Sequence, residues 1–361
     1  MLTSRRFLLL LLLIECAYAG FALARAPRWD AFLIGDCPYY AAACESLLRD
    51  GDWDLRNQLP GDLSDHNSFF ALSHDQRVVP KHSVLMPIFS LPFRAVFGAA
   101  GLLIFSLVQI FVLIVGIAIL AGDNPASRLL ALVAYLSTPF LAYTFNYSPD
   151  VLATALLVWA FVFAIRNRPF ACGLMAGLAV WAKIYLALVV LPIGIILLAA
   201  GWRILMKAGI AGMIALLPML LINAHLFGSP FVTGYDRDAR MTEAGFVLSE
   251  HYSRFHQPLL TGLRNLMFDG RIGMFRKAPL WILWPLGLLP RWRTRPSVAV
   301  AMTLSILANV IFFALYDEWD ASEFGNRFLF PALALGFAMQ GKLWEWARER
   351  WMSSRQVKLG T

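Results

Sequence analysis

The feature that most constrains this chain is a series of apolar segments long enough to cross a lipid bilayer. A transmembrane helix needs about 20 consecutive, mostly apolar residues, and this 361-residue chain is 59% hydrophobic and only 15% charged. Soluble domains carry about 25% charged residues, so the composition excludes an ordinary soluble enzyme and also a disordered chain. We place the spans at 7–25, 99–121, 127–145, 149–166, 170–182, 184–200, 204–225, 279–290, 297–315 and 327–345. The sequence therefore predicts an all-α, polytopic integral membrane protein with about ten transmembrane helices.

The basic residues of the short loops predict how these spans are oriented. They fall on one side under this assignment: Arg5, Arg6, Arg128, Arg166, Arg168, Arg203, Lys207, Arg291, Arg293 and Arg295, with Arg348, Arg350, Arg355 and Lys358 in the tail 346–361. Because cytoplasmic loops are enriched in Lys and Arg, this side is predicted to be cytoplasmic, with both termini there. A net charge of +8 is then explained without nucleic-acid binding. We treat 1–361 as a single membrane domain, with central spans over 99–225 and final spans over 279–345.

Three of these segments have features of their own. The first, 7–25, also resembles a signal peptide with an A-x-A cleavage site at Ala17–Ala19, although a retained helix is the reading we adopt. A single helix over 170–200 would be about 46 Å long, too long for a hydrocarbon core of about 30 Å. It would also bury Lys183 near its middle, so we expect two shorter helices with Lys183 at or near a surface. The prolines of 279–290 predict a broken helix.

Two long polar segments are predicted on the outer face: an acidic loop, 27–83, and a basic loop, 226–278. In the acidic loop, Pro38–Arg49 has apolar residues at helical spacing and stops at Asp50-Gly51. Asp36 precedes this helix, where it either caps the helix or serves as a general base at the membrane surface.

Several other polar residues of the outer face have two interpretations each. Lys81 and His82 are either interfacial anchors or a phosphate contact and a hydrogen-bond donor. They lead into the Pro-interrupted run 84–98, which we expect to lie along the interface. Asp150 either caps the helix that follows it or contacts a substrate hydroxyl. The arginines of the basic loop, among them Arg271, suggest an anion site, because a guanidinium fork suits phosphate.

The sequence lacks the common motifs of nucleotide and metal chemistry. It has no P-loop, no dinucleotide Gly fingerprint, no H-E-x-x-H and no C-x-x-C. Its four cysteines show no metal-ligand spacing. Cys37 and Cys44 are seven helical residues apart, about 10.5 Å of rise, which is too far for a disulfide.

Five short segments stand in order along nearly the whole chain: Gly35–Tyr40 with Glu45–Leu55, Lys81–Ser83, Ala176–Lys183, Gly228–Tyr235 and Phe324–Pro331. They resemble, in turn, G-D-E-P-x-Y with S-L-L-x-D-G-D-x-D-L, K-H-x-P-G, G-L-A-x-L-T-K/R, G-S-P-x-x-T-G-Y and G-x-R-Y/F-L-x-P. These are patterns of the glycosyltransferase C superfamily, especially the bacterial relatives of dolichyl-phosphate-mannose protein mannosyltransferases and aminoarabinose transferases.

The resemblance implies an inverting transferase in a bacterial inner membrane with its active face in the periplasm. The donor would be a polyprenyl-phosphate sugar, reached from the membrane lipid, and the acceptor a glycan, lipid or protein hydroxyl. Asp36 would be the base, and Lys81, Arg271 or Arg327 would stabilise the departing phosphate. His82, Asp150 and Tyr235 complete the predicted substrate-binding residues.

The chain also departs from the family pattern. Cys37 stands where the family usually has a second acid, so we expect no metal, although some relatives use a divalent one. Two alternatives follow: a transporter or flippase for a lipid-linked or small anionic molecule, and a non-catalytic relative of the transferase fold.

Overall fold

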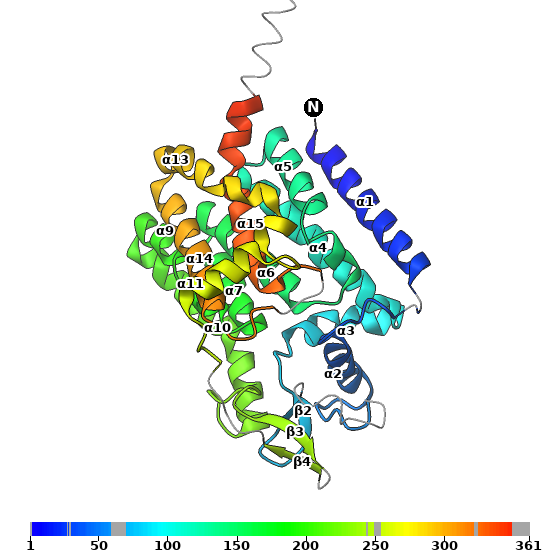
Figure 1. The fold of residues 1–361 in the computed structure, drawn as a ribbon. Coiled ribbons are helices and arrows are strands. Elements are labelled where there is room, and N and C mark those ends of the chain that lie inside the picture. Colours follow the sequence, from blue (N-terminus) through cyan, green and yellow to red (C-terminus); the bar gives the residue numbers. More distant parts are fainter. Residues whose placement is uncertain are drawn as a thin grey trace, which may run out of the picture.

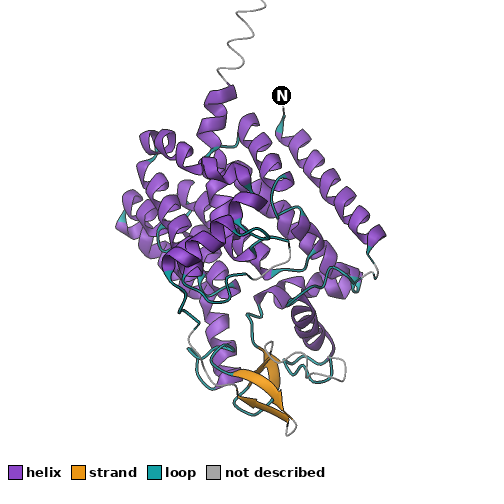
Figure 2. Ribbon diagram, viewed as in Figure 1, coloured by secondary structure: helices purple, strands orange, loops and turns teal. Residues whose placement is uncertain are grey.

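The structure is a computed structural model that describes residues 2–26, 28, 30–58, 70–242, 245–248, 254–320 and 324–348. In this part of the chain the protein is mostly helical, as predicted (Figures 1 and 2). Four helices are long and apolar enough to cross a membrane: α1 (Ser4–Arg25), α4 (Ala100–Ala121), α10 (Trp202–Phe227) and α14 (Pro296–Ala314). The count of ten spans stays a prediction. The tail residues Arg350, Arg355 and Lys358 lie outside the described residues.

The shorter helices complete the bundle. They are α2 (Cys37–Arg49), α3 (Leu85–Phe97), α5 (Pro125–Leu136), α6 (Pro149–Ile165), α7 (Pro169–Ala182), α8 (Leu186–Val190), α9 (Ile193–Ala200), α11 (Leu259–Phe268), α12 (Met274–Lys277), α13 (Trp284–Thr294) and α15 (Phe330–Met339). In the described part of the chain, three 3₁₀ turns lie between them: η2 (Ala142–Phe145), η3 (Pro279–Leu283) and η4 (Arg327–Leu329). A further helical stretch covers 341–348.

Several helix ends follow directly from local sequence. The Asn124 side chain accepts hydrogen bonds from the backbone N–H groups of Ala126 and Ser127 and so caps α5. The Ser148 hydroxyl accepts from Asp150 N and caps α6 in the same way. Each capping residue is followed by a proline, which suits the first helical turn because its N–H would have no intrahelical partner.

The expected break near Lys183 is present, because α7 ends at Ala182 and α8 begins at Leu186. Lys183 is only 8% exposed in the folded chain, and its position near a membrane surface stays a prediction. Its charge is instead compensated by a carboxylate inside the protein, as described below, and this removes the cost that motivated the surface assignment.

Three other predicted segments compare differently with the structure. The span 127–145 ends early, since α5 stops at Leu136 and a 3₁₀ turn follows. The segment 279–290 is broken, as its prolines predicted, into η3 and α13. The run 84–98 forms α3, which packs on α2 and α4; its place relative to a membrane stays a prediction.

The core of the bundle is formed by α6 and α15 with α4, α7 and α14 around them. All ten residues of α15 are buried, as are most residues of α6. Helices α7 and α10 approach closely through small residues. A Cβ added at Gly173 would lie 1.9 Å from the backbone oxygen of Ala208. Close backbone approach at glycine is a common way for membrane helices to pack.

The two outer loops are not purely irregular, and this corrects the all-α prediction. Strands β1 (Phe70–Leu72) and β2 (Val78–Pro80) from the first loop join β3 (Asp238–Thr242) and β4 (Gly245–Leu248) from the second. The antiparallel sheet has the order β2-β1-β3-β4. Phe70 pairs with Pro80 on one side and with Ala239 on the other. The sheet lies at the end of the molecule far from the N-terminus, beside α2 (Figure 1), so the acidic and basic loops form one structure there.

Candidate active site

Asp36 lies at the junction between an irregular segment and α2. Gly35 adopts φ +61°, a conformation that few side chains tolerate. Asp36 holds the N-cap position of α2, but its side chain makes no capping hydrogen bond. The capping interpretation is therefore wrong. Instead, Arg327 Nη2 donates to Asp36 Oδ2 at 2.6 Å, across 291 residues of sequence.

The segment before η4 holds Arg327 in place. Gly325 has φ +138°, and a Cβ there would lie 2.4 Å from the Pro139 ring. The Asn326 side chain accepts from Phe328 N and donates to the backbone oxygen of Trp319 at 2.6 Å. The turn is thus fixed on both sides, and Arg327 is the residue that it presents to Asp36.

Asp150 is the second carboxylate that Arg327 meets. Its side chain is fully buried, and its Oδ2 lies 3.6 Å from Arg327 Nε. Because Ser148 caps α6, the interpretation of Asp150 as the helix cap is wrong. On its other side, Asp150 Oδ1 lies 3.4 Å from Lys183 Nζ. Buried charges need such partners, because an isolated charge would pay the full cost of leaving water.

We call Asp36, Arg327, Asp150 and Lys183 the charge cluster. Its members come from four separate parts of the chain, and its two acids and two bases balance. The side chains of all four are at most 15% exposed. Sequence reasoning found three of them as site residues and missed Lys183. The cost of an unpaired lysine at a helix break was the signal that could have identified it.

The environment of Asp36 keeps it ionised. Burial acts to raise the pKa of its carboxyl group, but the positive charges of Arg327 and Lys183 and the hydrogen bond from Arg327 act more strongly in the opposite direction, so the pKa falls below its ordinary value. A carboxylate in this state can accept a proton. It is also tied to a guanidinium, which makes it a weaker base until that contact loosens.

His82 and Tyr235 form a second group next to the cluster. His82 Nδ1 and the Tyr235 hydroxyl are hydrogen-bonded at 2.8 Å, and the His82 ring stacks on Tyr40 with the ring centres 5.7 Å apart. Burial lowers the pKa of His82, and the positive charges of Lys183, Lys81 and Arg327 lower it further. The negative charge of Asp36 acts in the opposite direction but is outweighed. His82 is therefore neutral near pH 7.

Lys81 and Arg271 lie in different surroundings from the cluster. Lys81 is buried, with its Nζ 2.8 Å from Asp238 Oδ2 on β3 and 5.8 Å from the centre of the Tyr235 ring. Arg271 is exposed and pairs with Asp320 at 3.4 Å. The Arg237 guanidinium donates to the backbone oxygens of Leu72 and Ser73, which makes it a support of the sheet.

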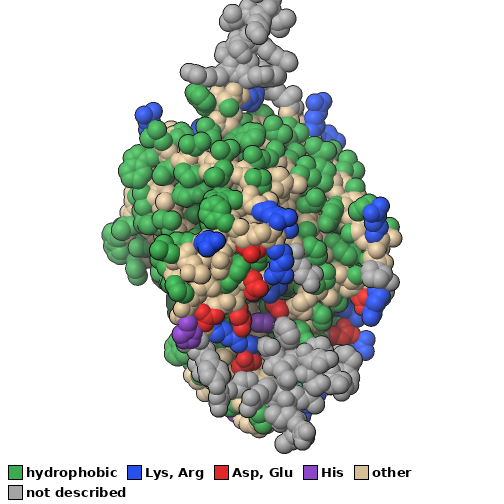
Figure 3. Space-filling view, in the orientation of Figure 1, with side chains coloured by type: hydrophobic (Ala, Val, Ile, Leu, Met, Phe, Trp, Pro, Cys, Tyr) green, Lys and Arg blue, Asp and Glu red, His purple; other side chains and the backbone are tan. Residues whose placement is uncertain are grey.

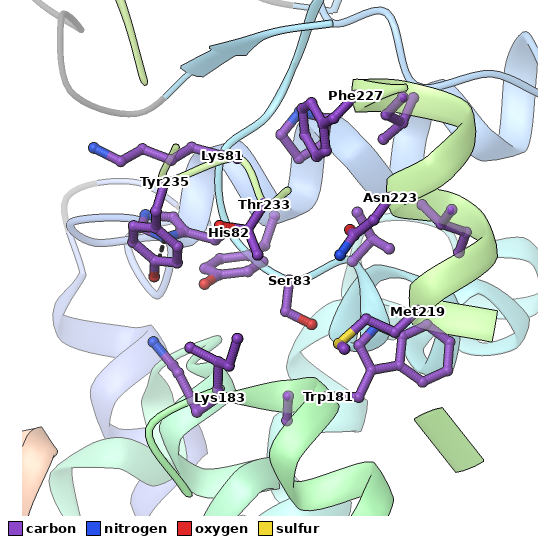
Figure 4. A pocket seen from close by; sticks show the side chains of 18 residues that line it. Lys81, His82, Ser83, Trp181, Lys183, Met219, Asn223, Phe227, Thr233 and Tyr235 are labelled. Carbon is purple, nitrogen blue, oxygen red and sulfur yellow. Dashed lines mark hydrogen bonds between the residues drawn. The ribbon is translucent and has the colours of Figure 1, made fainter. Parts of the chain in front are cut away.

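A pocket opens beside these residues, between α7, α10 and the segments around His82 and Tyr235 (Figure 4). One part of its lining is polar and includes Lys183, His82, Ser83, Thr233, Asn223 and Tyr235; another part is apolar and includes Trp181, Met219, Ile222, Leu226 and Phe227. Lys183 lines this pocket and also contacts Asp150. Asp36, Asp150 and Arg327 do not line it. The pocket therefore joins the cluster through Lys183 and offers both an ionic and an apolar contact.

Cys37 is buried at the position where the resembled sequence pattern usually has a second acid. Its thiol donates to Asn146 Oδ1 at 3.6 Å, and burial raises its pKa to about 12. In the described ranges, no group of three or more His, Cys, Asp or Glu side chains is arranged to hold a metal ion. The residues present at Asp36 and Cys37 thus do not form a metal-binding pair.

Comparisons with known proteins agree on the fold. Neither a family model nor a curated protein sequence matches the chain. Among solved structures, ArnT from Cupriavidus metallidurans bound to undecaprenyl phosphate is similar, with 14% identity, a TM-score of 0.62 and coverage of 94% of this chain and 60% of that one. The same protein in the apo state gives a TM-score of 0.60 over 92% of this chain and 58% of that one.

An archaeal enzyme shows the same likeness. The oligosaccharyltransferase AglB from Archaeoglobus fulgidus, in complex with an inhibitory peptide and a dolichol-phosphate, is 14% identical with a TM-score of 0.54, over 99% of this chain and 52% of that one. The chain therefore spans a little over half the length of the solved structures that it resembles. Its fold is similar to that of these solved structures, which agrees with the resemblance that the sequence motifs predicted.

Proposed function

We propose that this protein is a membrane glycosyltransferase that moves a sugar from a polyprenyl-phosphate donor to an acceptor hydroxyl. The observation that carries the proposal is the contact between Asp36 and Arg327, at 2.6 Å and largely buried. It brings together a carboxylate that can accept a proton and a cation that can receive a phosphate. The structures of similar fold include one with undecaprenyl phosphate and one with dolichol-phosphate.

The pocket supports a lipid-phosphate donor. Its apolar residues on α7 and α10 suit the first part of a polyprenyl chain, and Lys183 with His82 and Tyr235 suits the phosphate. Soluble sugar nucleotides would not need the apolar part. We assign the phosphate to Lys183, which lines the pocket and belongs to the charge cluster, and to Arg327, which contacts Asp36. Lys81 also lines the pocket but pairs with Asp238 outside the cluster, and Arg271 is exposed.

The proposed reaction is a single inverting displacement. Asp36 removes the proton of the acceptor hydroxyl, whose oxygen attacks the anomeric carbon of the sugar. The bond between that carbon and the phosphate oxygen breaks, and its electron pair leaves on the phosphate. Arg327 and Lys183 stabilise the charge that develops there. Asp150 holds both cations in position, since it lies between them. The reaction as written uses no metal.

The proposed setting is the outer face of a bacterial inner membrane. Asp36 immediately precedes α2, which lies beside the sheet (Figure 1), and acidic and basic side chains gather toward this end of the face in Figure 3. The basic short loops predict that this end faces the periplasm. The acceptor is a glycan, a lipid or a protein, and the sheet that joins the two outer loops is the element nearest to where it would bind.

The test is to incubate the purified protein with radiolabelled polyprenyl-phosphate sugars and to follow release of polyprenyl phosphate. Asp36→Asn is expected to abolish release while folding is retained. Asp30→Asn is the matched control, since Asp30 lies in the same loop and its ion-pair partner among the described residues is the exposed Arg28. Full activity of the Asp36→Asn variant would show that Asp36 is not the base. Movement of the labelled lipid across vesicles without cleavage would indicate a transporter or flippase, and neither event would indicate a non-catalytic relative.

A further inference from the structure

A second pocket lies at the opposite end of the molecule from the charge cluster. It has a volume of about 490 Å³, within the range of roughly 300–1,000 Å³ that is usual for ligand sites. The C-terminal ends of α4, α6 and α13 surround it, together with Lys342 from the helical stretch 341–348. Figure 1 shows α13 and this stretch near the N-terminus and far from the sheet.

The lining of this pocket is strongly basic. It holds the side chains of Arg166, Arg291, Arg295 and Lys342 against one carboxylate, Asp123. That carboxylate is already paired with Arg128 at 3.1 Å, and Lys342 is paired with Glu345 at 2.7 Å. Arg166 and Arg295 make no ion pair with any residue in the part of the chain that the structure describes. The pocket therefore carries positive charge that its own acids do not balance.

Arg291 adds a buried cation to the wall. The residue is 6% exposed, and its Nη2 donates to the backbone oxygens of Leu120, Ala121 and Ala338, at 2.8 to 3.4 Å. Its Nε is buried and has no hydrogen-bond partner among the described residues. Carbonyl dipoles at the ends of helices offset only part of a full charge. A buried guanidinium with a spare donor, beside two free arginines, is a site built to receive an anion.

The remaining lining residues indicate which kind of anion. Ile119, Leu120, Val162 and Ile165 place apolar surface next to the arginines. A freely soluble phosphate would leave this surface unused, whereas a lipid brings a phosphate and hydrocarbon together. Basic pockets between transmembrane helices on the cytoplasmic side bind the phosphates of anionic lipids in this way. The basic short loops predict the cytoplasmic side for this end of the chain.

We propose that this pocket binds the phosphate group of an anionic membrane lipid. Arg166 and Arg295 contact the phosphate oxygens, Arg291 supplies the buried charge, and the apolar residues contact the first part of an acyl chain. The site is separate from the donor pocket, and it does not depend on the proposed transferase activity.

The test is thermal unfolding of the full-length protein in a neutral detergent, titrated with phosphatidylglycerol, phosphatidylcholine or inorganic phosphate. Phosphatidylglycerol is expected to raise the melting temperature and phosphatidylcholine is not. The double variant Arg166→Gln/Arg295→Gln is expected to weaken phosphatidylglycerol binding about 25-fold, at roughly five-fold per basic residue removed. Both arginines are exposed, so the variant should melt like the native protein without lipid.

The matched control is Arg203→Gln/Arg293→Gln, which makes the same change in net charge at two exposed arginines that do not line the pocket. This control is expected to keep native affinity. Equal affinity of the Arg166→Gln/Arg295→Gln variant and the control would overturn the proposal. Equal stabilisation by phosphatidylcholine would also overturn it. Full stabilisation by inorganic phosphate alone would overturn it by assigning the pocket to a soluble anion.

Discussion

The charge cluster makes a quantitative prediction about stability. Asp150→Asn keeps the shape of the side chain but removes the negative charge that lies between Arg327 and Lys183. The cluster then holds two cations against Asp36 alone, in a place where the Asp150 side chain has no exposure to water. Breaking a buried ion pair by removing one partner costs about 3–5 kcal/mol. We expect the free energy of unfolding to fall by about that amount.

A second substitution separates this explanation from a general packing defect. Lys183→Met alone leaves Asp150 with the contacts to Arg327 and to the Ser148 hydroxyl, and we expect it to be destabilising as well. The double variant Asp150→Asn/Lys183→Met restores neutrality, because the Asp36–Arg327 pair remains. The two effects should therefore not add: the double variant is expected to be about 0.5–3 kcal/mol more stable than the sum of the two single changes predicts.

The assay is denaturant or thermal unfolding in detergent micelles, with all four proteins measured in one detergent. Because the prediction concerns an interaction energy, it does not depend on the absolute stability in the micelle. Additive effects, within about 0.3–0.5 kcal/mol, would refute the reasoning, since they would mean that Asp150 and Lys183 do not sense each other's charge.

Two further predictions concern the acidic limb of the pH profile and the packing of α7. Arg327→Gln removes a cation that lowers the pKa of Asp36, while burial still raises that pKa. Transfer activity should therefore be lost at a higher pH on acidification than in the native protein. An acidic limb of the pH–rate profile that does not move would contradict this. In Gly173→Ala, the new Cβ meets the backbone of Ala208, so the unfolding free energy should fall by about 1–3 kcal/mol. Gly209→Ala on α10 is its control, because a Cβ there meets nothing within 4 Å; equal destabilisation of both variants would show that the close approach of the helices is not the cause.

Local signals account for two helix starts, of which the predicted spans matched Pro149 and missed Pro125 by two residues. Asn124-Pro125 and Ser148-Pro149 combine a side chain that caps with a proline that fits the first turn, and both helices begin at the proline. The helix over Pro38–Arg49 also ends before Asp50-Gly51 as predicted. These features depend on a few neighbouring residues, so the sequence alone determines them.

The failures share a different cause. Asp36 and Asp150 sit where a cap would sit, and only the folded chain decides whether each carboxylate turns to its own helix or to Arg327. The burial of Lys183 was not predicted because its partner comes from another helix. The strands β1 and β2 have three residues each, too few for an alternating pattern to be recognised, and they are stabilised by pairing with a loop far away in the sequence.

The contact between Asp36 and Arg327 has a consequence for the order of the proposed reaction. In the absence of a donor, the arginine keeps the carboxylate ionised but also occupies it. A phosphate that binds near Lys183 offers Arg327 a third anion beside Asp36 and Asp150. A guanidinium that turns toward the phosphate releases Asp36 as a stronger base. Asp150 lowers the cost of this exchange, because its negative charge stays beside Arg327 throughout. The base would thus become free only when the group that must depart is already held, which would limit proton abstraction from an acceptor when no sugar donor is bound.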